Sequence, residues 1–123
     1  MVEDYKRKVG VGGEHKAAHY LEEKGYVILE RNYRTRKGEI DIICEKNGTL
    51  IFVEVKTRTA KSFGEPSEAI NPHKVKKIIE VAEDYASRKG LLGICDTRFD
   101  VISISYSEDK ESIEHIKDAF RSL

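Results

Sequence analysis

Three consecutive stretches of the chain alternate between apolar and polar residues, which predicts three β-strands. They cover residues 26–35, 39–46 and 49–58, and a period of two is typical of strands. Asn47-Gly48 joins the second stretch to the third and is a strong signal for a two-residue hairpin turn. A similar stretch at residues 97–106 predicts a fourth strand.

Apolar residues recur at helical spacing in three further stretches. The first helix is expected over about residues 13–24, the second over about 72–89 and the third over about 109–122. Asn71 is placed to cap the second helix, and Pro72 suits its first turn. The expected buried stripes are Ala17, Ala18 and Leu21; Val75, Ile78, Ile79, Ala82 and Ala86; and Ile113, Ile116 and Phe120.

The resulting order, α-β-β-β-α-β-α, predicts an α/β fold with a mixed central sheet flanked by helices. A chain of 123 residues has the size of one domain, so we expect a single domain over residues 1–123. Residues 1–9 are polar and are expected to be flexible, and the glycines that follow them extend this lead-in to Gly13.

Charge is unevenly distributed along the chain. The 22 Lys and Arg residues balance the 22 Asp and Glu residues. Residues 31–77 nevertheless hold eleven basic and six acidic side chains, whereas residues 96–123 hold four and seven. Such a basic middle can attract an anionic ligand although the total charge is zero.

The two cysteines, Cys44 and Cys95, form no CxxC pair, which argues against a thiolate zinc site. They are expected to be small buried side chains in a reducing compartment. The sequence shows neither a signal peptide nor the roughly 20 apolar residues of a membrane helix. We therefore expect a cytoplasmic protein.

The hairpin turn fixes which residues face each other. Pairing Lys46 with Thr49 places Asp41 opposite Glu54 and Glu39 opposite Lys56, and opposed residues share one face of a sheet. The opposite, core face is expected to carry Ile40, Ile42, Cys44, Ile51, Val53 and Val55.

Two carboxylates opposed across a strand pair repel each other unless a cation lies between them. Carboxylate oxygens are preferred ligands of Mg²⁺, and Lys56 on the same face could contact a metal-bound water or a phosphate oxygen. This chemistry is metal-assisted phosphodiester hydrolysis. On the pattern alone, an ordinary half-exposed strand in which Lys56 neutralises a carboxylate remains an alternative, although Asp is a poor strand former.

Several motifs resemble a known nuclease family. Gly-Glu-Ile-Asp at 38–41 followed by Val-Glu-Val-Lys at 53–56 resembles the PD-(D/E)xK motif, with Ile40 where the motif's name has proline. Over roughly residues 10–104 the chain resembles the YraN-like family of bacterial proteins, which is related to archaeal Holliday-junction resolvases. The other matching motifs are Gly13-Glu14, Ala-x-x-Tyr-Leu at 17–21, Arg-Asn-Tyr-Arg at 31–34, the segment 52–58, and Arg-Phe-Asp-Val at 98–101.

The resemblance implies a restriction-endonuclease-like fold and a metal-dependent endonuclease acting on nucleic acid, with branched DNA in repair or recombination as a candidate substrate. In that reading Asp41, Glu54 and the carbonyl of Val55 hold Mg²⁺ or Mn²⁺, and Lys56 orients the attacking water. Glu14 would assist as a third carboxylate, or it would only complement the positive N-terminus of its helix. Because related resolvases act as symmetric dimers, the resemblance also suggests a homodimer.

The basic middle supplies candidate phosphate contacts, with an ordinary solvated surface as the alternative. The candidates are Arg34, Arg36, Lys37, Arg58, Lys61, Lys74 and Lys77. A nucleic-acid-binding module that does not cut, or a scaffold for a protein partner, remain alternative functions.

The remaining charged side chains are assigned structural or surface roles. Glu39 is expected to pair with Lys56 or Arg34, and Asp100 with Arg98 or Arg58. His15 and His19 lack the HExxH context and a third ligand, so we expect surface histidines.

Overall fold

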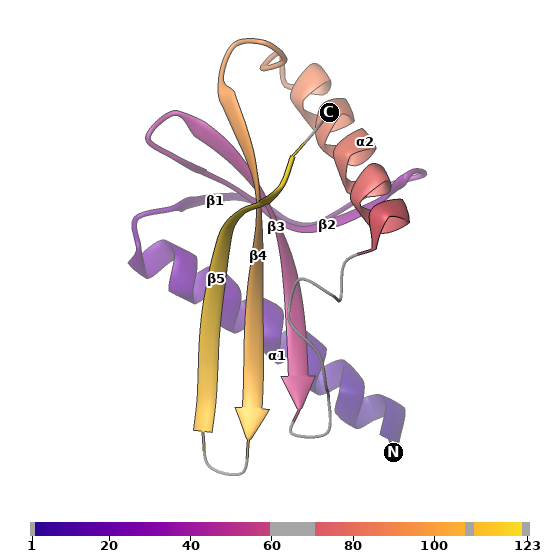
Figure 1. Cartoon of the computed structure of the whole chain (residues 1–123), viewed down its shortest axis with the longest axis vertical. Helices are drawn as coiled ribbons and strands as arrows, with labels where there is room; N and C mark the ends of the chain where they lie inside the picture. The colour runs from indigo at the N-terminus through magenta and orange to yellow at the C-terminus, as the bar shows by residue number, and fades with distance from the viewer. Residues whose placement is uncertain (1, 60–70, 108–109, 122–123) are drawn as a thin grey trace.

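The computed structural model describes residues 2–59, 71–107 and 110–121, and its strands form one mixed sheet in chain order (Figure 1). β3 and β4 run parallel, and each of the other neighbouring pairs is antiparallel. The strands are β1 (Val27–Thr35), β2 (Gly38–Lys46), β3 (Thr49–Thr59), β4 (Asp96–Ser107) and β5 (Lys110–Phe120).

Helices α1 (Val2–Glu23) and α2 (Pro72–Arg88) each build a separate half of the core. The buried side chains around α1 include Leu21 with Ile42 and Val53 of the sheet. Those around α2 include Val81 with Phe52, which lies next to Val53 on β3 and therefore points to the opposite face. The central strands are thus apolar on both faces, and the predicted α/β class with a mixed sheet is confirmed. No helix among the described residues combines the length and the apolar character of a membrane-spanning segment.

The hairpin between β2 and β3 has the predicted register. Lys46 pairs with Thr49, and the described ladder runs to Ile42 and Val53. Asn47 and Gly48 both have positive φ, 51° and 82°, as a tight hairpin turn requires. One face assignment is wrong, because Ile40 packs in the α2 half of the core instead of joining Ile42 in the α1 half.

The predicted second helix is confirmed. Asn71 caps α2, since its side-chain oxygen accepts a 2.8 Å hydrogen bond from the backbone amide of Lys74. Its buried residues are Ile78, Val81, Ala82, Tyr85 and Ala86. Val75 and Ile79, which were assigned to the stripe, are only half-buried.

Two predicted helices differ from the structure. The first was expected to begin near Gly13, but α1 begins at Val2 and includes the glycines of the supposed lead-in. The stretch expected to form a last helix is strand β5, in which Ile113 pairs with Ile104 and Phe120 with Phe99. The reason is that β4 is buried and its edge needs backbone hydrogen bonds, which a strand supplies and a helix cannot.

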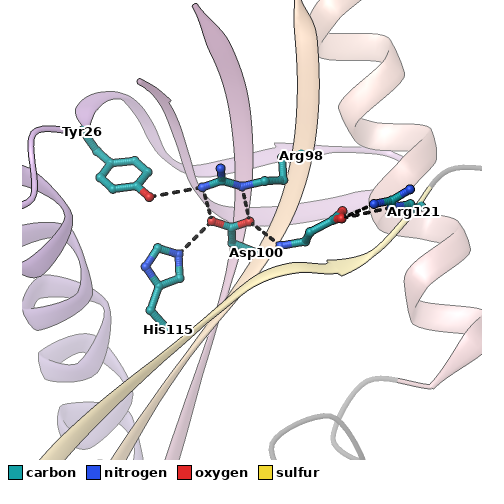
Figure 2. A network of polar contacts seen from close by, with 6 residues as sticks. Tyr26, Arg98, Asp100, His115 and Arg121 are labelled. Carbon is teal, nitrogen blue, oxygen red and sulfur yellow. Dashed lines mark hydrogen bonds and ion pairs between the residues drawn. The ribbon is translucent and has the colours of Figure 1, made fainter. Parts of the chain in front are cut away.

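A buried acid fastens β5 to β4 (Figure 2). Asp100 is 0% exposed and accepts two hydrogen bonds from Arg98, at 2.8 and 2.9 Å, and a third from the Asp118 amide at 3.0 Å. His115 Nε2 lies 2.7 Å from the same carboxylate, and Arg98 also donates to the Tyr26 hydroxyl. Burial alone would raise the pKa of Asp100, but these partners lower it to about 2. The structural role and the Arg98 partner predicted for Asp100 are confirmed.

We predict that Asp100→Asn lowers the free energy of unfolding by about 3 kcal/mol at pH 7, because the buried part of Arg98 loses its counter-ion. Asp84→Asn, which disrupts the Asp84–Arg88 pair with its exposed arginine, is the matched control and should cost about 0.5 kcal/mol. Urea denaturation measures both. Since the folded-state pKa of Asp100 is depressed, its contribution should be present above pH 4 and fade as the pH falls towards 2. Equal losses in the two variants would contradict this role.

Candidate active site

The proposed site lies where the β2–β3 ladder ends. Asp41 follows the last described pair of that ladder and is 8% exposed. Its Oδ2 accepts a 2.8 Å hydrogen bond from the backbone amide of Val55. The Asp41 side chain thus accepts a hydrogen bond from an amide that would otherwise donate to the backbone of β2. This bond holds the carboxylate of β2 against the backbone of β3.

Glu54 is the second buried carboxylate, at 4% exposure. Burial and the negative charge of Asp41 raise the pKa of Glu54 to about 7. Burial also raises the pKa of Asp41, although the Val55 amide and the neighbouring lysines oppose the shift. Because ionisation of both carboxyl groups is unfavourable here, a positive charge beside them is stabilised.

Lys74 of α2 supplies one such charge, with its Nζ 3.2 Å from Glu54 Oε2. Lys56, two residues beyond Glu54 on β3, is half-buried beside it. Burial and the nearby Lys74 amine lower the pKa of Lys56. Burial opposes the charged form of Lys74 too, but its contacts with Lys56 and Glu54 raise its pKa overall. The two amines therefore differ, and Lys56 is the one that gives up a proton more readily.

Glu14 reaches the same region from the other helix. Burial and the charge of Asp41 raise the pKa of Glu14, whereas interaction with the Asn32 side chain lowers it. The approach depends on Gly13, because a Cβ there would lie 2.4 Å from Thr57 Oγ1 of β3. A residue expected to belong to a flexible lead-in is instead a point of close approach between α1 and the sheet.

The donor set suits a divalent cation of the Mg²⁺ type. Asp41 and Glu54 offer carboxylate oxygens, and ionisation of both is unfavourable without a nearby positive charge. Among the side chains that the structure describes, no three or more His, Cys, Asp or Glu residues are grouped to hold a metal by themselves. Such an ion would therefore complete its shell with water, backbone or substrate oxygens, as Mg²⁺ commonly does.

The basic candidates do not all lie at the carboxylates. Only Lys74 makes a described ion pair with one of them, and Arg58 is half-buried two residues after Lys56 on β3. Lys77 is exposed on α2, near Gly38. Arg34, Arg36 and Lys37 are exposed at the β1–β2 turn, and Lys61 lies outside the described residues.

The surface and pairing predictions around the site are confirmed. Glu39 is exposed and pairs with Arg34 at 2.7 Å, not with Lys56. His15 and His19 are exposed, and His19 pairs with Glu23. Cys44 is buried as predicted, but the prediction of a buried Cys95 is wrong, because that residue is only half-buried; both are free thiols.

Sequence reasoning missed two features of the site. Lys74 was assigned to phosphate contact alone, and its ion pair with Glu54 was not predicted. Asn32, which interacts with Glu14, was also missed. Asn32 has a positive φ of 53°, a conformation in which Asn is enriched, so an Asn within a strand pattern was the available signal.

We predict that Glu54→Gln stabilises the metal-free protein at pH 8 by roughly 2 kcal/mol and has little effect at pH 5. The pKa of Glu54 is raised to about 7 in the folded state, so folding favours its protonated form. Its stabilising contribution is present at low pH and is lost as the pH rises through 7. Urea denaturation in EDTA measures this, with the exposed Glu39→Gln as control. If the free energy of unfolding differs between wild type and Glu54→Gln by the same amount at pH 5 and pH 8, the raised pKa of Glu54 is refuted.

Comparison with known proteins identifies relatives across nearly the whole chain. The profile described as "Uncharacterised protein family UPF0102" matches residues 13–104. A UPF0102 protein of Alkaliphilus oremlandii is 49% identical over 116 residues, covering 93% of this chain and 98% of the relative. One from Syntrophomonas wolfei is 45% identical with the same coverages, and one from Geobacter sulfurreducens is 47% identical, covering 91% and 88%. The chain therefore belongs to the UPF0102 family.

Proposed function

We propose that this protein is a metal-dependent endonuclease that hydrolyses phosphodiester bonds in nucleic acid, with DNA as the expected substrate. The observation that carries the proposal is the pair of buried carboxylates, Asp41 and Glu54, beside a lysine with a lowered pKa. This arrangement has an energetic cost if it serves stability alone, since neither acid is readily ionised there. The PD-(D/E)xK resemblance of the same residues adds support, as does the succession of α1, three antiparallel strands, α2 and a parallel strand.

In this proposal Asp41, Glu54 and the Val55 carbonyl hold Mg²⁺ or Mn²⁺. A bound ion would supply Lewis acidity at the scissile phosphate. The Val55 amide fixes the Asp41 carboxylate through its 2.8 Å hydrogen bond, so the ligand is held in place before substrate arrives.

The lysines have separate roles in the proposed reaction. Lys56 lies beside the carboxylates, so its amine orients the attacking water and stabilises the negative charge of the transition state. Lys74 keeps its charge and neutralises the phosphate that is attacked. Glu14, with its raised pKa, lies on the α1 side of Asp41 and can hold a proton or a water molecule there.

A binding module that never cuts is the second candidate, and the Lys74–Glu54 pair favours it. That pair already compensates the charge of Glu54 without a metal. Such a module would retain DNA with a steep salt dependence and leave it intact.

We predict that the purified protein, incubated with Mg²⁺ or Mn²⁺, cleaves at least one of single-stranded, duplex, flap or four-way DNA. Lys56→Ala and Asp41→Asn should each reduce the rate at least about a hundredfold, because each removes a group required in the transition state. Lys117→Ala, an exposed lysine on β5 that is separated from β3 by β4, is the matched lysine control and should cleave at the wild-type rate.

Gel assays on the four substrates, with EDTA as a blank, measure cleavage. Activity that persists in Lys56→Ala and Asp41→Asn would point to a contaminant and reject the proposal. Tight DNA binding without cleavage under any of these conditions would select the binding module.

A further inference from the structure

A hollow of about 270 Å³ lies between the β1–β2 turn and the C-terminal half of α2. Four cationic side chains line it together with a single carboxylate, that of Asp84. The lining residues are Arg34, Thr35, Arg36, Lys37, Asp84 and Arg88.

The charge inside this hollow is not balanced. Arg88 Nε lies 3.1 Å from Asp84 Oδ2, and Arg34 pairs with Glu39 of β2 at 2.7 Å. Arg36 and Lys37 are exposed in the turn itself and make no described ion pair. A net positive charge therefore remains where two elements meet, as an anion-binding site requires.

The hollow and the carboxylate site lie along one side of α2. Lys74, Lys77, Val81, Asp84 and Arg88 are spaced three, four, three and four residues apart, so they form a single stripe on the helix. The first of them contacts Glu54, and the last two line the hollow.

The position of Gly38 on β2 shows that the middle of this α2 stripe lies against the sheet. A Cβ placed on Gly38 would lie 3.6 Å from Val81 and 3.8 Å from the Cβ of Lys77, so the middle of the stripe lies against the start of the strand. From Gly38, β2 leads to Asp41 in one direction and the turn leads to the hollow in the other. Lys77 lies between them and supplies a cation along the way.

Fourteen residues of α-helix separate Lys74 from Arg88, which corresponds to about 21 Å. One strand of duplex DNA carries a phosphate every 3.4 Å along the axis, so this separation spans about six base pairs. Cations at both ends of this distance, with Lys77 between them, match a nucleic-acid backbone better than they match a single small anion.

We propose that the hollow is a second phosphate-binding site, which holds the backbone of the same nucleic acid about six base pairs from the bond at Glu54 and Lys74. This inference rests on the proposed function for the position of the reacting phosphate. The hollow itself reads charge and not base sequence, because its side chains address phosphate oxygens. Arg88 was not among the phosphate contacts predicted from the sequence, because it lies after residues 31–77, the basic middle of the chain.

The test compares two exposed arginines, each paired with an acid that lies three or four residues before it in the chain. Arg88→Ala leaves Asp84 unpaired in the hollow, and Arg121→Ala leaves Asp118 unpaired near the other edge of the sheet. Fluorescence anisotropy with a labelled 20-base-pair duplex, in EDTA and at 50–200 mM salt, measures binding without cleavage. We expect Arg88→Ala to weaken binding about eightfold at 0.1 M salt and to reduce the salt slope by about 0.9, the contribution of one phosphate contact. Arg121→Ala should match the wild type.

Equal affinities of the two variants, or no duplex binding by the wild type, would overturn the second site. Preference for a polyglutamate peptide over the duplex would overturn it as well.

Cleavage assays test the second site separately from the nuclease proposal. If the protein cleaves, Arg88→Ala should raise the DNA concentration that gives half-maximal rate and leave the rate at saturation within about twofold, as loss of uniform binding does. Selective loss of binding in Arg88→Ala without any cleavage would support the hollow and reject the nuclease.

Discussion

The hydrogen bond from the Val55 amide to Asp41 is the contact on which the rest of the site depends. It is made next to the last described β2–β3 pair, so a backbone donor is satisfied by a carboxylate and the acid is held inside the protein. The burial of Glu54 on the neighbouring strand, together with the negative charge of Asp41, raises the pKa of Glu54, which in turn favours the nearby cations. One exchange of a ladder hydrogen bond for a side-chain one thereby creates a strongly polar centre within an apolar sheet.

The two helices complete this centre from opposite faces. Gly13 lets α1 approach β3 closely enough for Glu14 to interact with Asp41, and the Asn71 cap fixes the start of α2 three residues before Lys74. Neither helix could be shifted along the sheet without moving a charged side chain away from the carboxylates. The apolar packing and the polar site therefore constrain the same positions of the helices.

The sequence was most informative where local geometry decides the structure. Asn47-Gly48 sets the hairpin register, and continuing this register one pair beyond Ile42 and Val53 predicts that Asp41 and Glu54 lie together. Prediction from the sequence failed where contacts between residues far apart in the chain decide the structure. The spacing of Ile113, Ile116 and Phe120 is that of a helix, but the unpaired edge of β4 makes the segment a strand. The close approach at Gly13 and the ion pair of Lys74 also depend on residues far away in the chain, which periodicity cannot reveal.

The parallel pairing of β3 with β4 has a consequence for how the molecule folds. Thr49 pairs with Asp96, so this contact closes a long loop that contains all of α2. Loop closure of this kind is slow compared with formation of the β2–β3 hairpin, whose partners are neighbours in sequence. On a growing chain the acids of the hairpin would be present early and solvated by water. They would become the buried, poorly ionised pair of the native state only after the crossover helix had docked, so the chemistry of the site would be acquired at a late stage of folding.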